Sequence, residues 1–299
     1  MFPCRNTPKN VVMWGEGVAG LWGLLTNKLP YSQSASIRDI SHILDTRMTT
    51  KRLPAKLGKE PLIDVVCGVV FASDIPADAL LPGLLLPKLA GMKPKFEALP
   101  AAQLPQIIRD SDPNLLNAPL MRVVLDSQFT VLIGSKWLAV GCQMPYSGWT
   151  TFREMITTVF AVLGEAPFVK GIERHSLKYV DFIKSEEAGV SLSRFNLQIE
   201  IAGRKLTDQS TNIRTEIVER PFLHATTIIS PAIANNSDGT VMGSGVVIDV
   251  DTHRVEKFET KEFLEKLPQL LEEIHLSNKL FFFDLLSEAG LQELDPIYA

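Results

Sequence analysis

Short runs of β-branched and other apolar residues, separated by turn residues, constrain the fold of this chain more than any other feature. The clearest run spans residues 120–144, where Asp126–Ser127 and Gly134–Ser135 divide it into three short strands. The run 61–72 predicts another strand, with Pro61 at its first position, where a missing N–H does least harm. We therefore expect an antiparallel meander beside one long apolar strand.

Three segments predict helices that pack on these strands. The first lies near 76–90 and is interrupted by prolines. In the second, 151–163, apolar residues recur at helical spacing, and Thr151 opens a capping box in which its hydroxyl caps a first-turn amide. The third, 267–286, carries Pro268 in its first turn. Each presents one apolar face, so we expect all three to cover a sheet rather than stand alone.

The second half of the chain repeats the style of the first. Strands predicted at 194–203, 214–219, 222–230 and 245–251 lead into the final helix, as the strands of 120–144 lead into helix 151–163. This arrangement predicts an α+β fold of antiparallel sheets with helices packed on one face, built as two similar α+β halves. The predicted units are an N-terminal extension at 1–59, a first half at 60–185 and a second half with the C-terminal helix at 186–299.

Charge is distributed unevenly along the 299 residues. Residues 1–59 hold nine Lys and Arg against three Asp and Glu, a net charge of +6, whereas the rest holds 21 against 31, a net charge of −10. A body with that negative charge repels a phosphate backbone, so nucleic acid is a poor partner for the folded part. We expect 1–59 to be poorly ordered, with residues 1–47 preceding a natural start at Met48. A basic tail that contacts acidic surfaces is an alternative.

The three cysteines indicate a reducing compartment, and we expect a cytoplasmic protein. Three is an odd number, no CxxC pair exists, and Cys67 and Cys142 sit inside apolar strand-like runs. Residues 11–25 are apolar but contain Glu16 and four glycines, and a bilayer span needs about 18 uninterrupted apolar residues. The sequence therefore predicts no membrane partner.

The pattern that most resembles a catalytic or metal-binding site consists of Asp249, Asp251 and His253. On a continuing strand these alternate residues share one face, where two carboxylates and an imidazole could hold a divalent metal for a metal-assisted hydrolase. The competing interpretation is structural. Antiparallel strands often leave one face in water, and Asp251–Thr252–His253 reads as a turn. We favour the structural interpretation and predict no metal.

A second candidate set lies on the predicted strand 169–183. Its alternation places His175, Tyr179 and Asp181 on one face, within reach of general acid–base work. A hydrogen-bonded structural network explains these residues equally, and we favour it because a histidine is often satisfied by a neighbour. Tyr146 and Trp149, in the segment before helix 151–163, could anchor a protein partner or pack across the sheet edge.

No catalytic or cofactor signature accompanies these candidates. The chain has no HExxH, GxSxG or zinc-type Cys/His spacing, and the glycines at 239, 243 and 245 precede a strand instead of following one. We therefore expect no cofactor and lean against an enzyme. The leading prediction is a non-catalytic protein-interaction or binding module whose partner is another protein, with the hydrolase as the alternative.

The chain also resembles a sporadically distributed family of uncharacterised prokaryotic proteins of about 250–300 residues. The resemblance starts at KEPLIDVVCGVVF, a Pro-led apolar first strand, and continues through the meander at 121–142 and the aromatic-flanked helix after PYSGW. The strand with Arg174 and Tyr179 and the closing helix also fit, so it covers about residues 54–290. It implies no activity and no site residues. The patchy distribution implies a mobile-element or defence context.

Overall fold

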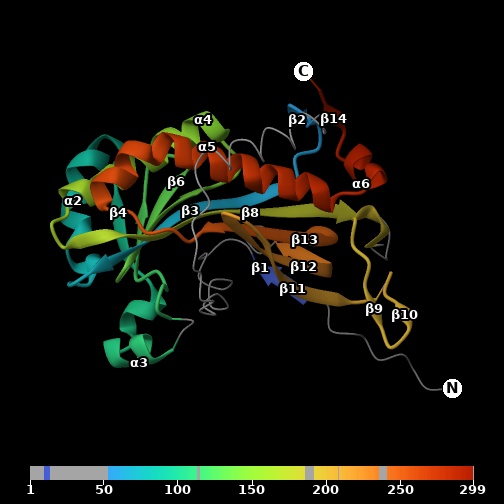
Figure 1. The fold of residues 1–299 in the computed structure, drawn as a ribbon, viewed down its shortest axis with the longest axis horizontal. Helices are drawn as coiled ribbons and strands as arrows, with labels where there is room; N and C mark the ends of the chain where they lie inside the picture. The colour runs from blue at the N-terminus through green and yellow to red at the C-terminus, as the bar shows by residue number, and fades with distance from the viewer. Residues whose placement is uncertain are drawn as a thin grey trace.

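The protein is built around one long, curved β-sheet (Figure 1). The computed structural model describes residues 10–13, 53–112, 115–185, 192–207, 209–235 and 241–298. The strands of the main sheet are β1 (Asn10–Met13), β3 (Leu62–Ser73), β4 (Lys95–Ala98), β5 (Met121–Val124), β6 (Phe129–Gly134), β7 (Trp137–Cys142), β8 (Val169–Ser185), β11 (Thr211–Glu219), β12 (Phe222–Asn235) and β13 (Val241–Arg254).

These strands run in the spatial order β1-β12-β13-β8-β3-β7-β6-β5-β4, and β11 also pairs with β12. Every pairing is antiparallel except that of β1 with β12, which is parallel. The predicted α+β class with antiparallel sheets is therefore confirmed. Two small ribbons stand apart: β2 (Lys56–Leu57) with β14 (Pro296–Ile297), and β9 (Glu200–Ile201) with β10 (Arg204–Lys205).

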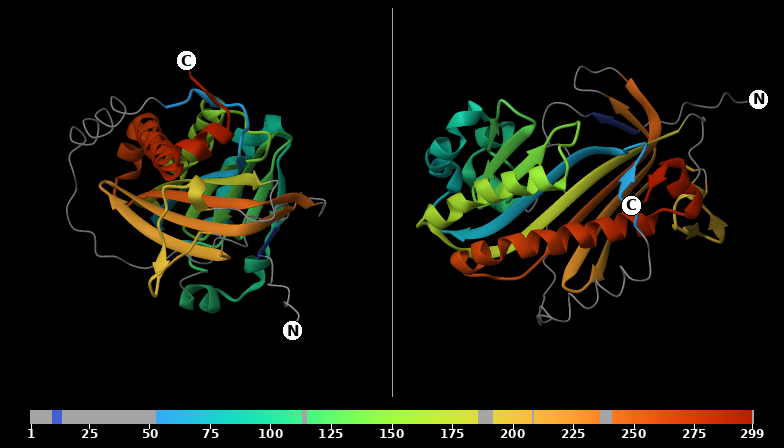
Figure 2. Two further views of the ribbon diagram at one scale, coloured as in Figure 1. Left: turned by 90° about the vertical axis from the view of Figure 1, so that its right-hand side faces the viewer. Right: turned by 90° about the horizontal axis from the view of Figure 1, so that it is seen from above.

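Helices cover one face of the sheet. Helix α5 (Thr260–Leu285) packs on β8, β13 and β12, and α4 (Trp149–Phe160) packs on β7. Figure 2 shows α5 lying along the sheet, and we call the side that it covers the helix face and the opposite side the far face. The remaining helices are α2 (Leu81–Leu89), α3 (Gln106–Ser111) and α6 (Glu288–Glu293). None of the helices in the described ranges is long and apolar enough to cross a membrane.

Helix α5 joins two apolar cores on the helix face. The part from Phe263 to Ile274 belongs to a core shared with α2, α4 and the strands β3, β5, β6, β7 and β8. Its second half, with Phe281, belongs to a core shared with β12 and β13. At 1.5 Å per residue, its 26 residues span about 39 Å. The single helix therefore connects the two ends of the sheet.

The sequence predicted the strands more accurately than the helix ends. The meander 120–144 and the strands at 61–72 and 169–183 appear where expected. Helix α4 begins earlier than predicted, with Gly148 as its N-cap residue and no side-chain cap, so the capping-box prediction for Thr151 is wrong. Helix α5 begins at Thr260, and Pro268 therefore lies inside it. The predicted strand 194–203 is wrong as well, because this segment contains only the two residues of β9.

The strands of both predicted halves join in the same sheet. β8, from 60–185, pairs with β13, from 186–299, over eleven residue pairs. Within the predicted N-terminal extension, residues 10–13 form β1, which adds to the sheet beside β12. The other residues of 1–47, and Met48 itself, lie outside the described ranges. The predicted start at Met48 therefore stays a prediction.

Candidate functional site

β8 supplies side chains to two polar groups that lie back to back on the sheet. Its register with β13 sets Lys178 opposite Asp251 on the far face and Tyr179 opposite Val250 on the helix face. The predicted placement of His175, Tyr179 and Asp181 on one strand face agrees with this register. The same strand therefore carries two sets of functional groups that cannot touch each other.

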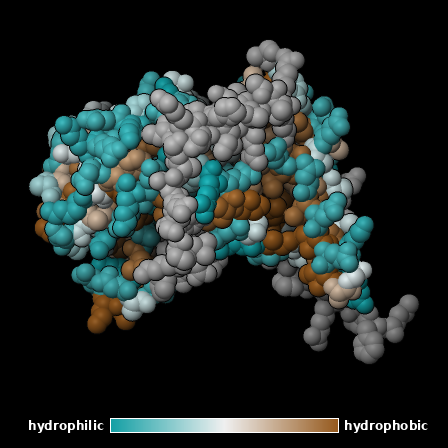
Figure 3. Space-filling model, viewed as in Figure 1, coloured by the Kyte–Doolittle hydropathy of each residue, from teal (hydrophilic) through white to brown (hydrophobic). Residues whose placement is uncertain are grey.

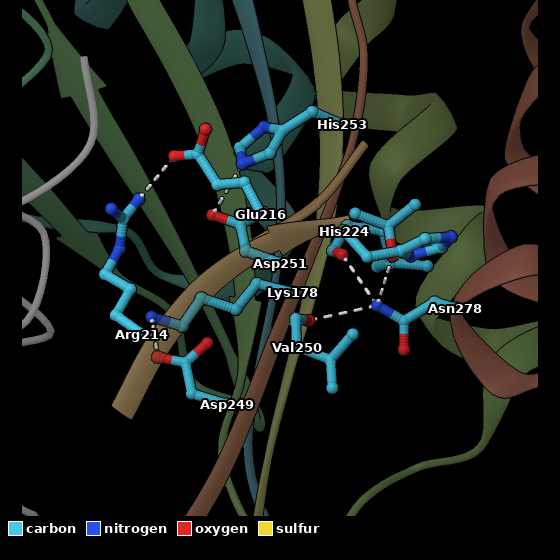
Figure 4. Close-up of polar contacts among 11 residues, drawn as sticks. Lys178, Arg214, Glu216, His224, Asp249, Val250, Asp251, His253 and Asn278 are labelled. Atoms are coloured by element: carbon cyan, nitrogen blue, oxygen red, sulfur yellow. Dashed lines mark hydrogen bonds and ion pairs between the residues drawn. The ribbon is translucent and has the colours of Figure 1, made fainter. Parts of the chain in front are cut away.

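The far-face set, which we call the ionic cluster, consists of Asp64, Lys178, Asp249, Asp251 and His253. The Nζ atom of Lys178 lies 2.6 Å from Oδ2 of Asp249, and Nε2 of His253 lies 3.3 Å from Oδ2 of Asp251 (Figure 4). Apart from Asp64, which is half-buried, these side chains are buried. Apolar groups flank the cluster along the strands: Val180, Phe182 and Val247 on one side, and Val66, Trp137 and Ala139 on the other.

Burial and mutual charge shift the pKa values within the ionic cluster in different directions. Burial raises the pKa of Asp64 to about 6 and also raises that of Asp249, although Lys178 opposes both shifts. For Asp251, burial is outweighed by His253, Lys178 and Arg174, so its pKa falls below the usual value. For Lys178, burial is outweighed by Asp249 and Asp251, so its pKa rises. The cluster thus holds Lys178 charged and Asp251 ionised.

This geometry corrects the structural interpretation of Asp249, Asp251 and His253. They share one strand face as predicted, but Asp251–Thr252–His253 is not a turn, because β13 continues to Arg254. The carboxylates do not face water either, since both are buried against neighbours on the far face. Within the described ranges, no set of three or more His, Cys, Asp or Glu side chains is arranged to hold a metal ion.

On the helix face, Asn278 fixes α5 to the sheet. Its Nδ2 atom donates to the carbonyl oxygens of Leu177 and Val250, each at 3.0 Å, and lies 2.9 Å from Oγ1 of Thr252. The Nδ1 atom of His224 also lies 2.9 Å from Oγ1 of Thr252. Figure 4 shows Asn278 on the opposite side of the strands from Lys178 and Asp251. One buried amide therefore bonds to two neighbouring strands at once.

A second helix-face group, which we call the aromatic cluster, consists of Tyr146, Trp149, Tyr179 and His275. The Trp149 and His275 rings stack with their centroids 4.0 Å apart. The Tyr179 hydroxyl lies 3.1 Å from Nδ1 of His275 and 3.3 Å from the hydroxyl of Tyr146. All four are half-buried, and they connect α4, β8 and α5.

The four side chains of the aromatic cluster are uncharged at neutral pH, and the pKa of the neighbouring Asp181 is shifted toward its neutral form. Burial, with a smaller effect from Lys279, lowers the pKa of His275 to about 3. Burial raises the pKa values of Tyr146 and Tyr179. Burial and the nearby carboxylate of Glu60 raise the pKa of Asp181 well above its usual range. Hydrogen bonding and stacking, rather than ion pairing, therefore hold this cluster together.

The predicted set His175, Tyr179 and Asp181 shares the helix face but does not converge. Four residues of strand separate His175 from Tyr179 by roughly 13 Å. Burial and the nearby Arg254 lower the pKa of His175 to about 3, and neither ring nitrogen has a hydrogen-bond partner among the described residues. Its ring lies 5.7 Å from that of Phe263. His175 therefore behaves as a neutral core residue.

Sequence reasoning missed His275 and Asn278, which α5 brings to the two helix-face groups. His275 lies on the predicted final helix and stacks on Trp149. Asn278 carried a usable signal: it falls between Ile274 and Phe281 in the apolar stripe of the helix. A polar residue at such a position predicts a buried hydrogen-bonded group.

One segment between β4 and β5 exposes apolar side chains to solvent. Ile107 is 76% exposed and Ile108 is 48% exposed on α3, and Leu104 and Leu116 flank the helix. Figure 3 shows apolar residues protruding at the lower left, where Figure 1 places α3. We call Leu104, Ile107, Ile108 and Leu116 the α3 patch.

Comparison with known proteins adds no identification. No family model matches the chain, and no curated protein matches it at a significant level.

Proposed function

We propose that this protein is a non-catalytic protein-binding module and that the α3 patch contacts its partner. The observation that carries the proposal is the exposure of the patch: four large apolar side chains lie within 13 residues, and Ile107 is 76% exposed. Isolated apolar side chains are common on protein surfaces, but a contiguous group marks an interaction site.

The local structure of the patch supports this role. Nη1 of Arg109 donates to the carbonyl oxygen of Leu104 at 2.7 Å, which holds the residues before α3 against the helix. Ile107 and Ile108 lie on α3, and Leu104 lies just before it in extended backbone, so the segment presents exposed apolar anchors for an apolar groove. The matching partner is a protein that presents such a groove.

The chemistry of the two polar faces also favours binding over catalysis. A general base works best with a pKa near the operating pH, whereas those of His175 and His275 fall to about 3. Lys178 is paired with Asp249, and the Cys67 thiol is buried with a raised pKa. The hydrolase alternative gains no support, because Asp249 is engaged by Lys178 and Asp251 by His253.

Tyr146 and Trp149, the sequence candidates for partner binding, both contact other side chains of the same chain. Trp149 stacks on His275 and donates its indole N–H to Glu272 at 3.0 Å. Tyr146 contacts the ring of Phe152 edge-on, with centroids 6.1 Å apart. Part of each apolar surface is therefore covered by neighbours within the chain, which favours the more exposed α3 patch as the contact.

The test is site-specific photo-crosslinking in the native host. A photoreactive residue at Ile107 should give one discrete adduct, which Ile108→Glu should abolish while the melting temperature stays unchanged. Ile201, which is 60% exposed and lies on β9, provides the matched control. An identical adduct pattern from positions 107 and 201, or an adduct that survives Ile108→Glu, would refute the proposal.

A further inference from the structure

β11 forms a long margin of the sheet whose outer side is open. It pairs with β12 from Thr211 to Glu219 without a register shift, and no other described strand pairs with it. Five consecutive residues, from Arg214 to Val218, are exposed. The other marginal strands of the described sheet, β1 and β4, have four residues each. β11 is thus the longest of the marginal strands in the described sheet.

β11 also lacks most of the devices that normally prevent edge pairing. Its sequence TNIRTEIVE contains no proline, and its ladder with β12 has no bulge, so its charged residues are the one edge-protecting feature that it carries. Ile217 is 40% exposed and Val218 is 48% exposed, so apolar groups on both faces of the strand contact water. A strand with these properties is a template for another strand.

The residue pattern of β11 is self-complementary about Thr215. Counting outward from this residue, Arg214 mirrors Glu216, and Ile213 mirrors Ile217. If two copies of the strand pair antiparallel with Thr215 at the centre, each Arg214 lies directly opposite the Glu216 of the second copy. Each Ile213 then lies opposite the Ile217 of the second copy.

We propose that β11 pairs with β11 of a second copy of this chain, which makes a two-fold symmetric dimer with a continuous sheet. Within one chain, Nη2 of Arg214 already lies 3.0 Å from Oε1 of Glu216 (Figure 4). Pairing about Thr215 turns these two ion pairs into an alternating group of four charges in which each has only opposite charges beside it. Opposite charges stabilise cross-strand pairs and like charges destabilise them.

The charges also select this register over its neighbours. Side chains directly opposite in an antiparallel pair point to the same face, so allowed registers differ by steps of two residues. Centring the pair on Arg214 sets two guanidinium groups against each other, and centring it on Glu216 sets two carboxylates against each other. A contact of this kind uses the same patch on both subunits, as two-fold symmetry requires.

Analytical ultracentrifugation of the full chain tests the proposal. We expect a dimer for the wild type and a monomer for Arg214→Glu and for Glu216→Arg, because each places like charges in opposition. The double variant Arg214→Glu/Glu216→Arg restores complementary charges and should restore the dimer. A monomeric wild type, or single variants that dimerise as well as the wild type, would overturn the proposal.

Cysteine crosslinking tests the register independently of charge. In a Cys4→Ser background, Thr215→Cys should form an intersubunit disulfide under mild oxidation, because the two Cα atoms at the centre lie roughly 4.5–5.5 Å apart. Ile217→Cys should not, because four residues of strand separate the two thiols by roughly 13 Å. Equal crosslinking at both positions would contradict the register. Dimerisation that survives Ile108→Glu separates this interface from the α3 patch.

Discussion

The two faces of β8 solve the problem of buried polar groups in different ways. On the helix face, neutral groups bond to backbone carbonyls and to each other, as Asn278 does with Leu177 and Val250. At one end of that face, Arg254 is held by Glu273 at 2.6 Å and by Glu256 at 2.7 Å. On the far face, charges compensate one another within the ionic cluster. Removing one side chain of a buried polar group should therefore lower the free energy of unfolding most where the partner left behind is charged.

The largest expected effect is therefore on the far face. Lys178→Ala leaves Asp249 buried beside Asp251 without its cation, and breaking a buried pair costs about 3–5 kcal/mol. We expect urea denaturation at pH 7 to show a loss of this size. The loss should shrink at pH 5, because Asp249 can then take up a proton.

Lys93 provides the matched control for this measurement. Its Nζ atom lies 2.7 Å from Oδ2 of Asp126, almost the same distance as in the buried pair, but both side chains are more than half exposed. Exposed pairs contribute little, so Lys93→Ala should change stability by less than about 1 kcal/mol. Similar losses for Lys178→Ala and Lys93→Ala would break the comparison.

The next effect concerns the helix face. Asn278→Ala removes the donor to two buried carbonyl oxygens, and we expect a loss of about 2 kcal/mol in the free energy of unfolding, since buried unsatisfied groups are costly. Asn196 donates to the carbonyl oxygens of Asp284 and Leu286 at 2.9 Å, but its side chain is exposed. Asn196→Ala should cost less, because water can replace its bonds. A larger loss for Asn196→Ala would contradict this account.

The pH dependence of stability should have opposite signs for His175 on the helix face and Asp64 on the far face. Folding lowers the pKa of His175 from 6.5 to about 3, so the unfolded state binds more protons in this window. The stability that the protein has with a neutral His175 is fully present above pH 6.5. Below that, the free energy of unfolding falls by up to about 1.4 kcal/mol per pH unit. His175→Leu should therefore lose less stability than the wild type between pH 6.5 and pH 5. Parallel stability curves for the two proteins would exclude this role.

The smallest expected effect has the opposite sign and lies on the far face. Folding raises the pKa of Asp64 from 3.8 to about 6, so the folded state binds more protons between these values. Asp64 therefore opposes folding above pH 6, and this opposition fades as pH falls toward 3.8. This shift corresponds to about 3 kcal/mol at most, and solvent screening of the half-buried carboxylate reduces it. Asp64→Asn should therefore stabilise the protein by about 1 kcal/mol at pH 8 and have little effect at pH 4. Destabilisation at pH 8 would show that Asp64 is needed as the counter-ion of Lys178.

The sequence predicted which residues share a face, but it did not predict what those faces contact. Strand alternation placed His175 and Tyr179 on the same side of β8 correctly, because side-chain direction follows from local backbone geometry. The burial of Asp249 depends on its contact with Lys178, which lies 71 residues earlier in the chain. A pattern read from neighbouring residues cannot predict which distant strand will pair with β13. The same limit applies to His275, whose stacking partner Trp149 comes from another helix.

The order of strands in the sheet also has consequences for synthesis of the chain. β3 lies between β7 and β8, so the ribosome must add about 70 residues after Ser73 before its first neighbour is complete. For β1 the interval is far longer, since its neighbour β12 begins only at Phe222. Such non-local pairing slows folding and leaves apolar strands unpaired meanwhile. The nascent chain should therefore depend on chaperones until α5 emerges and closes the helix face.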